Sequence, residues 1–137
     1  ETRGFFIEDD GGFQKPMEYW IGAMVFTPDA KMLITGSRDN TIRFFEMPTM
    51  NELRVVRGHN GWVRSLVVSP DGKVLISAGD DNTIRFWDIA TGRNFRTDKT
   101  HGGAVRGIAL SPDGLRLASA SWDRTVKLWE GGVEPAE

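Results

Sequence analysis

The chain alternates short runs of apolar and polar residues with turn segments, a pattern that predicts short strands. Residues 63–68 form one such run, and Ser69–Gly72 follows it. Serine at the first, proline at the second and glycine at the fourth position of this segment are typical of a type I turn. Asp81 and Asn82 tolerate the left-handed dihedral angles of a tight hairpin turn. With these two turns, the segments 74–77, 83–88 and 94–97 complete a predicted unit of four antiparallel strands.

The unit recurs at an offset of 42 residues. Ser69–Gly72 returns as Ser111–Gly114, and Thr27–Ala30 precedes both in the same register. Two more landmarks recur at this offset. The first is an Asp-x-Thr turn, at Asp39–Thr41, Asp81–Thr83 and Asp123–Thr125. The second is an aromatic residue followed by an acidic one, at Phe45-Glu46, Trp87-Asp88 and Trp129-Glu130. Four antiparallel strands per about 40–45 residues are typical of one blade of a β-propeller.

The identities of the repeated residues resemble those of the WD40 family. The second unit contains the full signature of a WD40 repeat, namely Gly58, His59, Ser77, Asp81, Trp87 and Asp88. The third unit contains the equivalents His101, Ser119, Asp123 and Trp129, with Thr100 in place of glycine and Glu130 in place of aspartate. The first unit is degenerate, with Met17, Thr35, Asp39 and Phe45 at the signature positions. The resemblance implies an all-β fold of three WD40-type β-propeller blades, each a four-stranded antiparallel unit.

The resemblance also implies how the chain is divided. A single WD40 segment is expected over residues 1–137, with an N-terminal extension at 1–16, repeats at 17–58, 59–100 and 101–130, and a tail at 131–137. The third unit lacks sequence for a fourth strand, and Arg3–Ile7 is expected to form an orphan outer strand. Because propellers close with about 4–8 blades, we expect a part of a ring that another copy of the chain or missing sequence completes.

Composition excludes several classes of site. The chain has no cysteine, which excludes a disulfide scaffold, a thiol nucleophile and a cysteine-ligated metal. Its net charge is −2 and its basic residues do not cluster, which argues against nucleic acid or an anionic membrane as a partner. No stretch approaches the roughly 20 apolar residues that span a bilayer. We expect a cytoplasmic or nuclear location and no cofactor.

Two sets of residues resemble a catalytic triad: Ser77, His59 and Asp81, and Ser119, His101 and Asp123. In the WD40 family these residues instead form a structural network that ends on the indole of a tryptophan, here Trp87 or Trp129. The constellation appears twice, and alanine follows each serine where a hydrolase nucleophile has glycine. We therefore expect a structural network and no catalytic residue. No metal site is expected, because the two histidines occupy equivalent positions of different blades.

The resemblance places three positions of each blade on the face around the central channel, where propellers commonly bind partners. The expected partner-binding residues are Trp20, Arg38, Trp62, Arg64, Asp80, Arg106 and Trp122, with Gly22 and Ala104 at the remaining positions. Tryptophan and arginine are enriched at binding hot spots, and the arginines could gather an acidic or phosphorylated segment. The alternatives are that the tryptophans pack on neighbouring blades, that the arginines are simply solvated, and that Asp80 pairs with an arginine.

These features predict a protein–protein interaction scaffold that binds peptides or partner domains on the propeller face, and not an enzyme. The alternative is a regulatory or sensor appendage of a larger multidomain enzyme or ATPase. Self-association or missing blades are expected to complete the ring.

Overall fold

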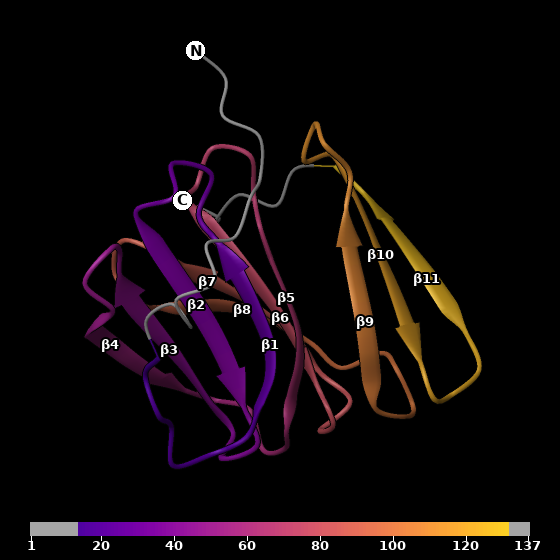
Figure 1. Cartoon of the computed structure of the whole chain (residues 1–137). Coiled ribbons are helices and arrows are strands. Elements are labelled where there is room, and N and C mark those ends of the chain that lie inside the picture. Colours follow the sequence, from indigo (N-terminus) through magenta and orange to yellow (C-terminus); the bar gives the residue numbers. More distant parts are fainter. Residues whose placement is uncertain (1–13, 132–137) are drawn as a thin grey trace, which may run out of the picture.

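Three antiparallel sheets follow one another along the chain and stand side by side, each made of consecutive strands (Figure 1). The computed structural model describes residues 14–131, so the outer strand expected at Arg3–Ile7 lies outside the described residues. The first sheet contains β1 (Ile21–Phe26), β2 (Met32–Ser37), β3 (Thr41–Glu46) and β4 (Asn51–Arg57). The second contains β5 (Val63–Val68), β6 (Val74–Gly79), β7 (Ile84–Asp88) and β8 (Asn94–Asp98). The third contains β9 (Val105–Leu110), β10 (Arg116–Ser121) and β11 (Val126–Glu130).

The all-β class is confirmed, and the predicted strand positions agree with the observed ones to within two residues in the second unit. The expectation of three four-stranded units is correct for the first two sheets. The third sheet has three strands in the described part of the chain, in agreement with the expected lack of a fourth strand in this unit. No helix in residues 14–131 is long and apolar enough to cross a membrane.

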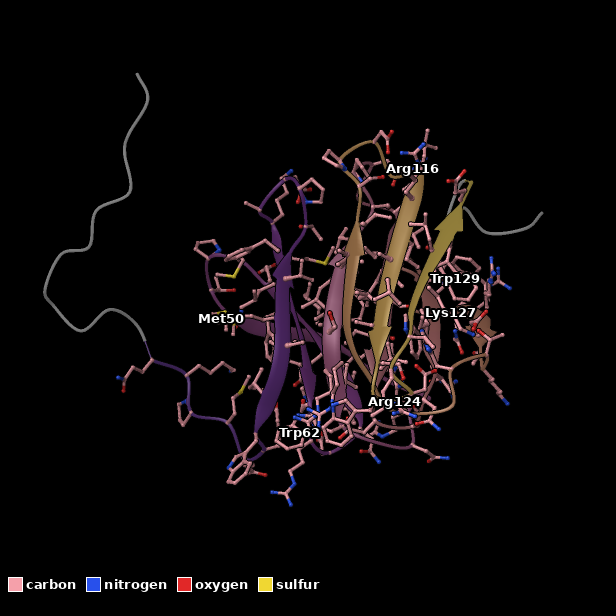
Figure 2. All side chains as sticks on the ribbon, turned by 90° about the vertical axis from the view of Figure 1, so that its right-hand side faces the viewer. Met50, Trp62, Arg116, Arg124, Lys127 and Trp129 are labelled. Carbon is pink, nitrogen blue, oxygen red and sulfur yellow. The ribbon has the colours of Figure 1, made fainter. Side chains whose placement is uncertain are left out.

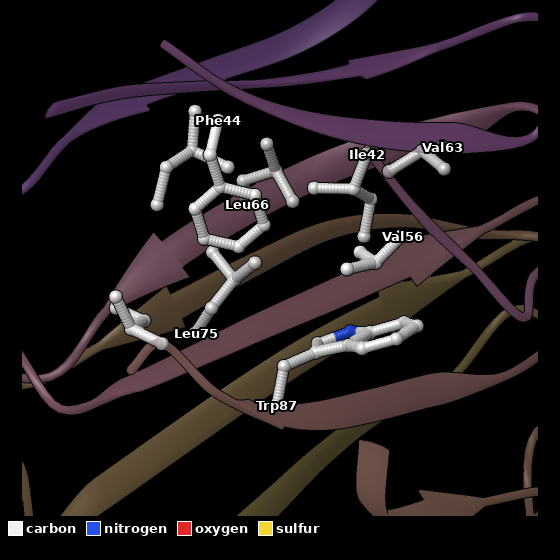
Figure 3. Close-up of a cluster of buried hydrophobic side chains, with 9 residues drawn as sticks. Ile42, Phe44, Val56, Val63, Leu66, Leu75 and Trp87 are labelled. Atoms are coloured by element: carbon white, nitrogen blue, oxygen red, sulfur yellow. The ribbon is translucent and has the colours of Figure 1, made fainter. Parts of the chain in front are cut away.

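The core consists of two layers, one on each side of the second sheet. Successive residues of a strand point to opposite faces, so Leu75 and Trp87 pack toward the first sheet while Val74 and Ile76 pack toward the third. The layer against the first sheet joins Ile42, Phe44, Val56, Val63, Leu66, Leu75 and Trp87 (Figure 3). Every residue of β6 is therefore buried. The blades are held together by apolar packing between sheets.

The turn after the first strand of each blade has the predicted form. The Gly72 N–H donates to the Ser69 carbonyl over 2.8 Å, and Gly72 adopts a φ of +74°. The Ser69 hydroxyl donates to the Asp71 carboxylate and accepts from the Val74 N–H, which fixes the exit of the turn. Gly114 repeats this conformation, whereas the first blade places Ala30 there, with a φ of +61°. A side chain at this φ is unfavourable because Cβ approaches the following carbonyl.

We expect Ala30→Gly to raise the free energy of unfolding by about 0.5–1 kcal/mol, because relief of the left-handed strain exceeds the extra entropy of glycine in the unfolded chain. Urea denaturation of the purified chain measures this change. Ala90→Gly is the control, since Ala90 is not in the left-handed region and should lose stability. A loss of stability in both variants would contradict the strain at Ala30.

The outward face of the third sheet remains uncovered. Ile84 and Phe86 of β7 are buried against the third sheet. Their equivalents in β11, Val126 and Leu128, have 74% and 64% of their surface exposed, because no described residue packs on that face. The same repeat position is thus core in one blade and surface in the next.

Candidate functional site

The residues expected on the channel face lie at one end of the strands and form a continuous stack. Trp20 precedes β1 and Trp62 precedes β5, and their ring centroids are 6.1 Å apart. The Arg38 guanidinium lies 4.9 Å from the Trp20 ring and 5.6 Å from the Trp62 ring. Figure 2 shows Trp62 at the end of the sheets opposite Arg116. The first blade therefore contributes Trp20 and an arginine that lies against both tryptophan rings.

The stack continues into the second and third blades through an ion pair. The Arg64 guanidinium lies 3.7 Å from the Trp62 ring and donates from Nε and Nη2 to the Asp80 carboxylate, at 3.0 and 2.9 Å. Arg106 Nε lies 3.4 Å from Asp80 Oδ1, and its guanidinium is 3.8 Å from the Trp122 ring. We call this set the Trp–Arg ladder: Trp20, Arg38, Trp62, Arg64, Asp80, Arg106 and Trp122.

The two ends of the ladder are open to solvent. Trp20 has 65% and Trp122 has 68% of its surface exposed, whereas Trp62 is partly buried. Asp80 forms ion pairs with Arg64 and Arg106. Arg38 takes part in none of the ion pairs found among residues 14–131. Asp80 thus pairs with neighbouring arginines, which was one of the alternatives, and the cluster keeps an excess of positive charge.

Gly22 occupies one of the three positions of the first blade expected on this face and has no side chain. A Cβ at this position would overlap Nε1 of Trp62 and the Val63 carbonyl. The missing side chain lets the Trp62 indole lie against the first blade, where its Nε1 is buried and has no hydrogen-bond acceptor. Glycine at position 22 therefore leaves the space that the Trp62 indole of the ladder occupies.

The second blade contains the predicted structural network. The Trp87 indole N–H donates to Ser77 Oγ over 2.8 Å. Because an indole is only a donor, the Ser77 hydroxyl can donate in turn to His59 Nε2, 2.7 Å away. His59 Nδ1 then donates to the Asp81 carboxylate at 3.0 Å, which also accepts from the Asn60 N–H. This chain of bonds ties β6 and β7 to the loop before β5.

The third blade repeats the network with a weaker last bond. His101 contacts Ser119 Oγ at 2.7 Å and Asp123 at 2.8 Å, but the Trp129 indole is 3.4 Å from Ser119. Trp129 packs against the layer between the second and third sheets but is only partly buried. No described strand flanks β11 on its outer side, where β8 flanks β7 in the second sheet.

The first blade has lost the network and compensates differently. Arg43 pairs with Asp39 at 3.0 Å and stacks on Tyr19 at 3.9 Å. Thr35 Oγ1, at the position of the network serine, is buried and has no hydrogen-bond partner. The degenerate signature gave no signal for the Arg43–Tyr19 contact, which only the structure identifies.

The network has the connectivity of a catalytic triad but not its accessibility. Ser77 has 0% of its surface exposed and its hydroxyl already accepts from Trp87. A nucleophilic serine must reach a substrate carbonyl and needs an oxyanion site beside it. A buried hydroxyl that holds an indole N–H satisfies a polar group in the core. Within residues 14–131, no three His, Asp or Glu side chains are grouped to hold a metal ion.

Burial raises the pKa of the Asp81 carboxyl, but the hydrogen bond and charge of His59 and the N–H of Asn60 outweigh it. The pKa of Asp81 therefore lies well below its usual range. A lowered folded-state pKa means that the carboxylate stabilises the fold fully above the unfolded-state pKa, about 3.9, and that this contribution is lost as pH falls below it.

We expect Asp81→Asn to destabilise the chain at neutral pH, and this deficit to shrink as pH falls below about 4. Asparagine keeps the shape of the side chain and does not titrate, so only the wild type loses its carboxylate. Urea denaturation of both proteins from neutral to acidic pH measures the gap. A gap that stays constant into the acidic range would contradict the lowered pKa.

Comparison with known proteins agrees with the geometry of the blades. The family model of the WD domain, G-beta repeat, matches residues 15–46, 50–88 and 92–130. Two solved structures, "Structure of U3-55K" and "Crystal structure of RRP9 WD40 repeats", are similar to this chain, each with a TM-score of 0.80 and 28% identity. Each match covers 85% of this chain but 37% of the other, so the chain spans little more than a third of these relatives. With three repeats that extend over most of its length, this chain belongs to the WD40 family.

Proposed function

We propose that this chain is a protein-interaction scaffold that uses the Trp–Arg ladder to bind an acidic or phosphorylated segment of a partner. Membership of the WD40 family supports the general role of a scaffold. The observation that carries the finer proposal is Arg38, which lies against the rings of Trp20 and Trp62 and has no carboxylate partner among residues 14–131. Arginine presents a planar set of donors that suits carboxylate and phosphate oxygens.

The ladder combines this charge with preorganised apolar surface. Stacking holds the guanidinium groups in place, so a bound anion would order few side chains. Trp20 and Trp122 offer exposed rings on either side, and tryptophan is the residue type most often found at binding hot spots. Asp80 offsets one of the three arginine charges, since it accepts hydrogen bonds from Arg64 and forms a longer ion pair with Arg106.

The test compares Arg38→Glu with the wild type in binding a short synthetic phosphoserine peptide flanked by glutamates, measured by calorimetry. Reversal of this charge should weaken binding by about tenfold or more, because a desolvated charge contact at a hot spot contributes at least about 1.4 kcal/mol. Arg57→Glu is the matched control, an exposed arginine outside the ladder. Equal affinity of Arg38→Glu and wild type for the peptide would contradict the proposal that the ladder binds it.

We further propose that the chain has no catalytic activity of its own, in keeping with a family of generally non-catalytic propellers. The alternative role, a regulatory or sensor appendage of a larger multidomain enzyme or ATPase, stays a prediction, as do the repeat boundaries and the cytoplasmic or nuclear location. The parent reading frame distinguishes the two roles, since a protein made only of blades would exclude the appendage.

The exposed face at Val126 and Leu128 supports the proposal that further blades, from a second copy or from other sequence, complete the ring. Light scattering on the purified chain separates the two sources. A dimer or trimer favours shared rings, and a monomer at high concentration would contradict completion by another copy.

A further inference from the structure

A cleft lies between the first and second blades, at the end of the strands opposite the ladder. It has a volume of about 620 Å³ and is lined by the start of β2, by β4 and by the two loops of the second blade around Lys73 and Ile89. Its walls are mainly apolar, with Met32, Phe44 and Ile89 among them. This volume is within the range of natural ligand sites, about 300–1,000 Å³.

Leu53 opens onto this cleft because of a bulge in β4. Phe44 pairs with Arg54 and Phe45 with Glu52, so Leu53 is an extra residue without a partner in β3. Bulges at sheet edges redirect a side chain, and Leu53 has 53% of its surface exposed while it lines the cleft. In the second blade the equivalent bulge residue is Phe95, which packs against Phe86 with ring centroids 6.3 Å apart. The shorter leucine leaves apolar surface uncovered.

The cleft is lined by two basic residues, Arg54 and Lys73, and by one acidic residue, Asp88. Arg54 donates from its two terminal nitrogens to the carbonyls of Ile89 and Ala90, at 2.8 and 3.0 Å, so it fixes one wall without a carboxylate. Lys73 is exposed at the rim and takes part in none of the ion pairs of residues 14–131. Asp88 is the one acidic lining residue, and its Oδ1 accepts the Ala90 N–H.

We propose that this cleft binds a peptide segment of another protein, with a bulky apolar side chain inside the cleft and a neighbouring carboxylate on Lys73. The excess of basic over acidic lining residues favours a carboxylate, and the exposed Leu53 beside the apolar wall of Met32 and Phe44 favours an apolar group. A peptide fits because β4 is the edge strand of its sheet, so its outer backbone groups can pair with an extended chain. This site is separate from the ladder and does not rest on the function proposed for it.

The test is selection of a displayed library of random peptides on the full chain, followed by calorimetry with the enriched sequences as synthetic peptides. We expect enriched peptides to place an aspartate or glutamate beside leucine, isoleucine or an aromatic residue. Lys73→Glu should weaken their binding by about tenfold or more, and Leu53→Phe, which copies the second blade, should weaken it by filling the cleft.

Two matched variants complete the test. Lys31→Glu changes the equivalent lysine of the first blade, which does not line the cleft, and should leave affinity unchanged. Arg38→Glu should also leave it unchanged, which separates this site from the ladder. Failure to enrich any sequence, enrichment of peptides without an acidic residue, or equal binding by wild type and Lys73→Glu would overturn the proposal.

Discussion

Trp87→Ala should lower the free energy of unfolding by about 3–5 kcal/mol, the usual cost of truncating a buried aromatic residue. Trp87 is almost fully buried between the first and second sheets, and its indole holds the Ser77 hydroxyl in the network (Figure 3). Truncation therefore leaves a cavity between two blades and removes a buried hydrogen bond. Urea denaturation followed by circular dichroism measures the loss.

The repeat provides the control for this prediction. Trp129→Ala removes the equivalent side chain of the third blade, which is only partly buried and makes the longer 3.4 Å bond. Its loss of stability should be clearly smaller. Trp87→Phe should fall between wild type and alanine, because Phe45 fills the same position in the first blade without exposure. Equal losses at Trp87 and Trp129 would contradict the view that the burial of the indole and its hydrogen bond determine the loss of stability.

Trp62→Ala should weaken binding of the acidic phosphopeptide by about 30-fold or more, the loss expected at a hot spot worth at least about 2 kcal/mol. Trp62 contacts Arg38, Arg64 and Trp20, so its removal takes the aromatic face from Arg64 and leaves Arg38 with Trp20 alone. The fold should survive, because the third blade has Ala104 at the equivalent position. Calorimetry gives the affinity, and circular dichroism confirms the fold.

A conservative variant separates stacking from bulk. Trp62→Phe keeps an aromatic face for the two arginines and should retain most of the affinity, since guanidinium groups also stack on phenylalanine. If alanine and phenylalanine bind the peptide as well as tryptophan does, the ladder has no role in recognition. Loss of the fold in Trp62→Ala alone would show instead that the residue is structural, and Trp62→Phe would then decide.

The repeat pattern predicted the fold well because each landmark has a local physical cause. The Ser69–Gly72 turn, the Asn82 turn and the alternation along β5 each depend on a few neighbouring residues. The constant offset of 42 residues then predicted the other two blades from the second one. The network around Ser77 was predictable in the same way, through the resemblance of its residues to the WD40 signature.

Features that depend on contacts between blades or on strand register were not fully predictable. Pairing of Asp80 with an arginine was one of the alternatives from the sequence, but its ion pairs with both Arg64 and Arg106, which join the second and third blades, were not predicted. The bulge that turns Leu53 into the cleft depends on the register of β3 and β4. The role of Gly22 under Trp62 depends on how closely two sheets approach. Strand register and the approach of neighbouring sheets are determined only when the strands pair and the sheets pack.

The most direct test of the ladder as a binding face is NMR of the indole N–H signals during titration with the acidic phosphopeptide. The chain has five tryptophans, three in the ladder and two in the structural networks. The indole signals of Trp20, Trp62 and Trp122 should shift with the peptide, while those of Trp87 and Trp129 stay in place. A titration that leaves the three ladder signals unmoved at saturating peptide would contradict the account.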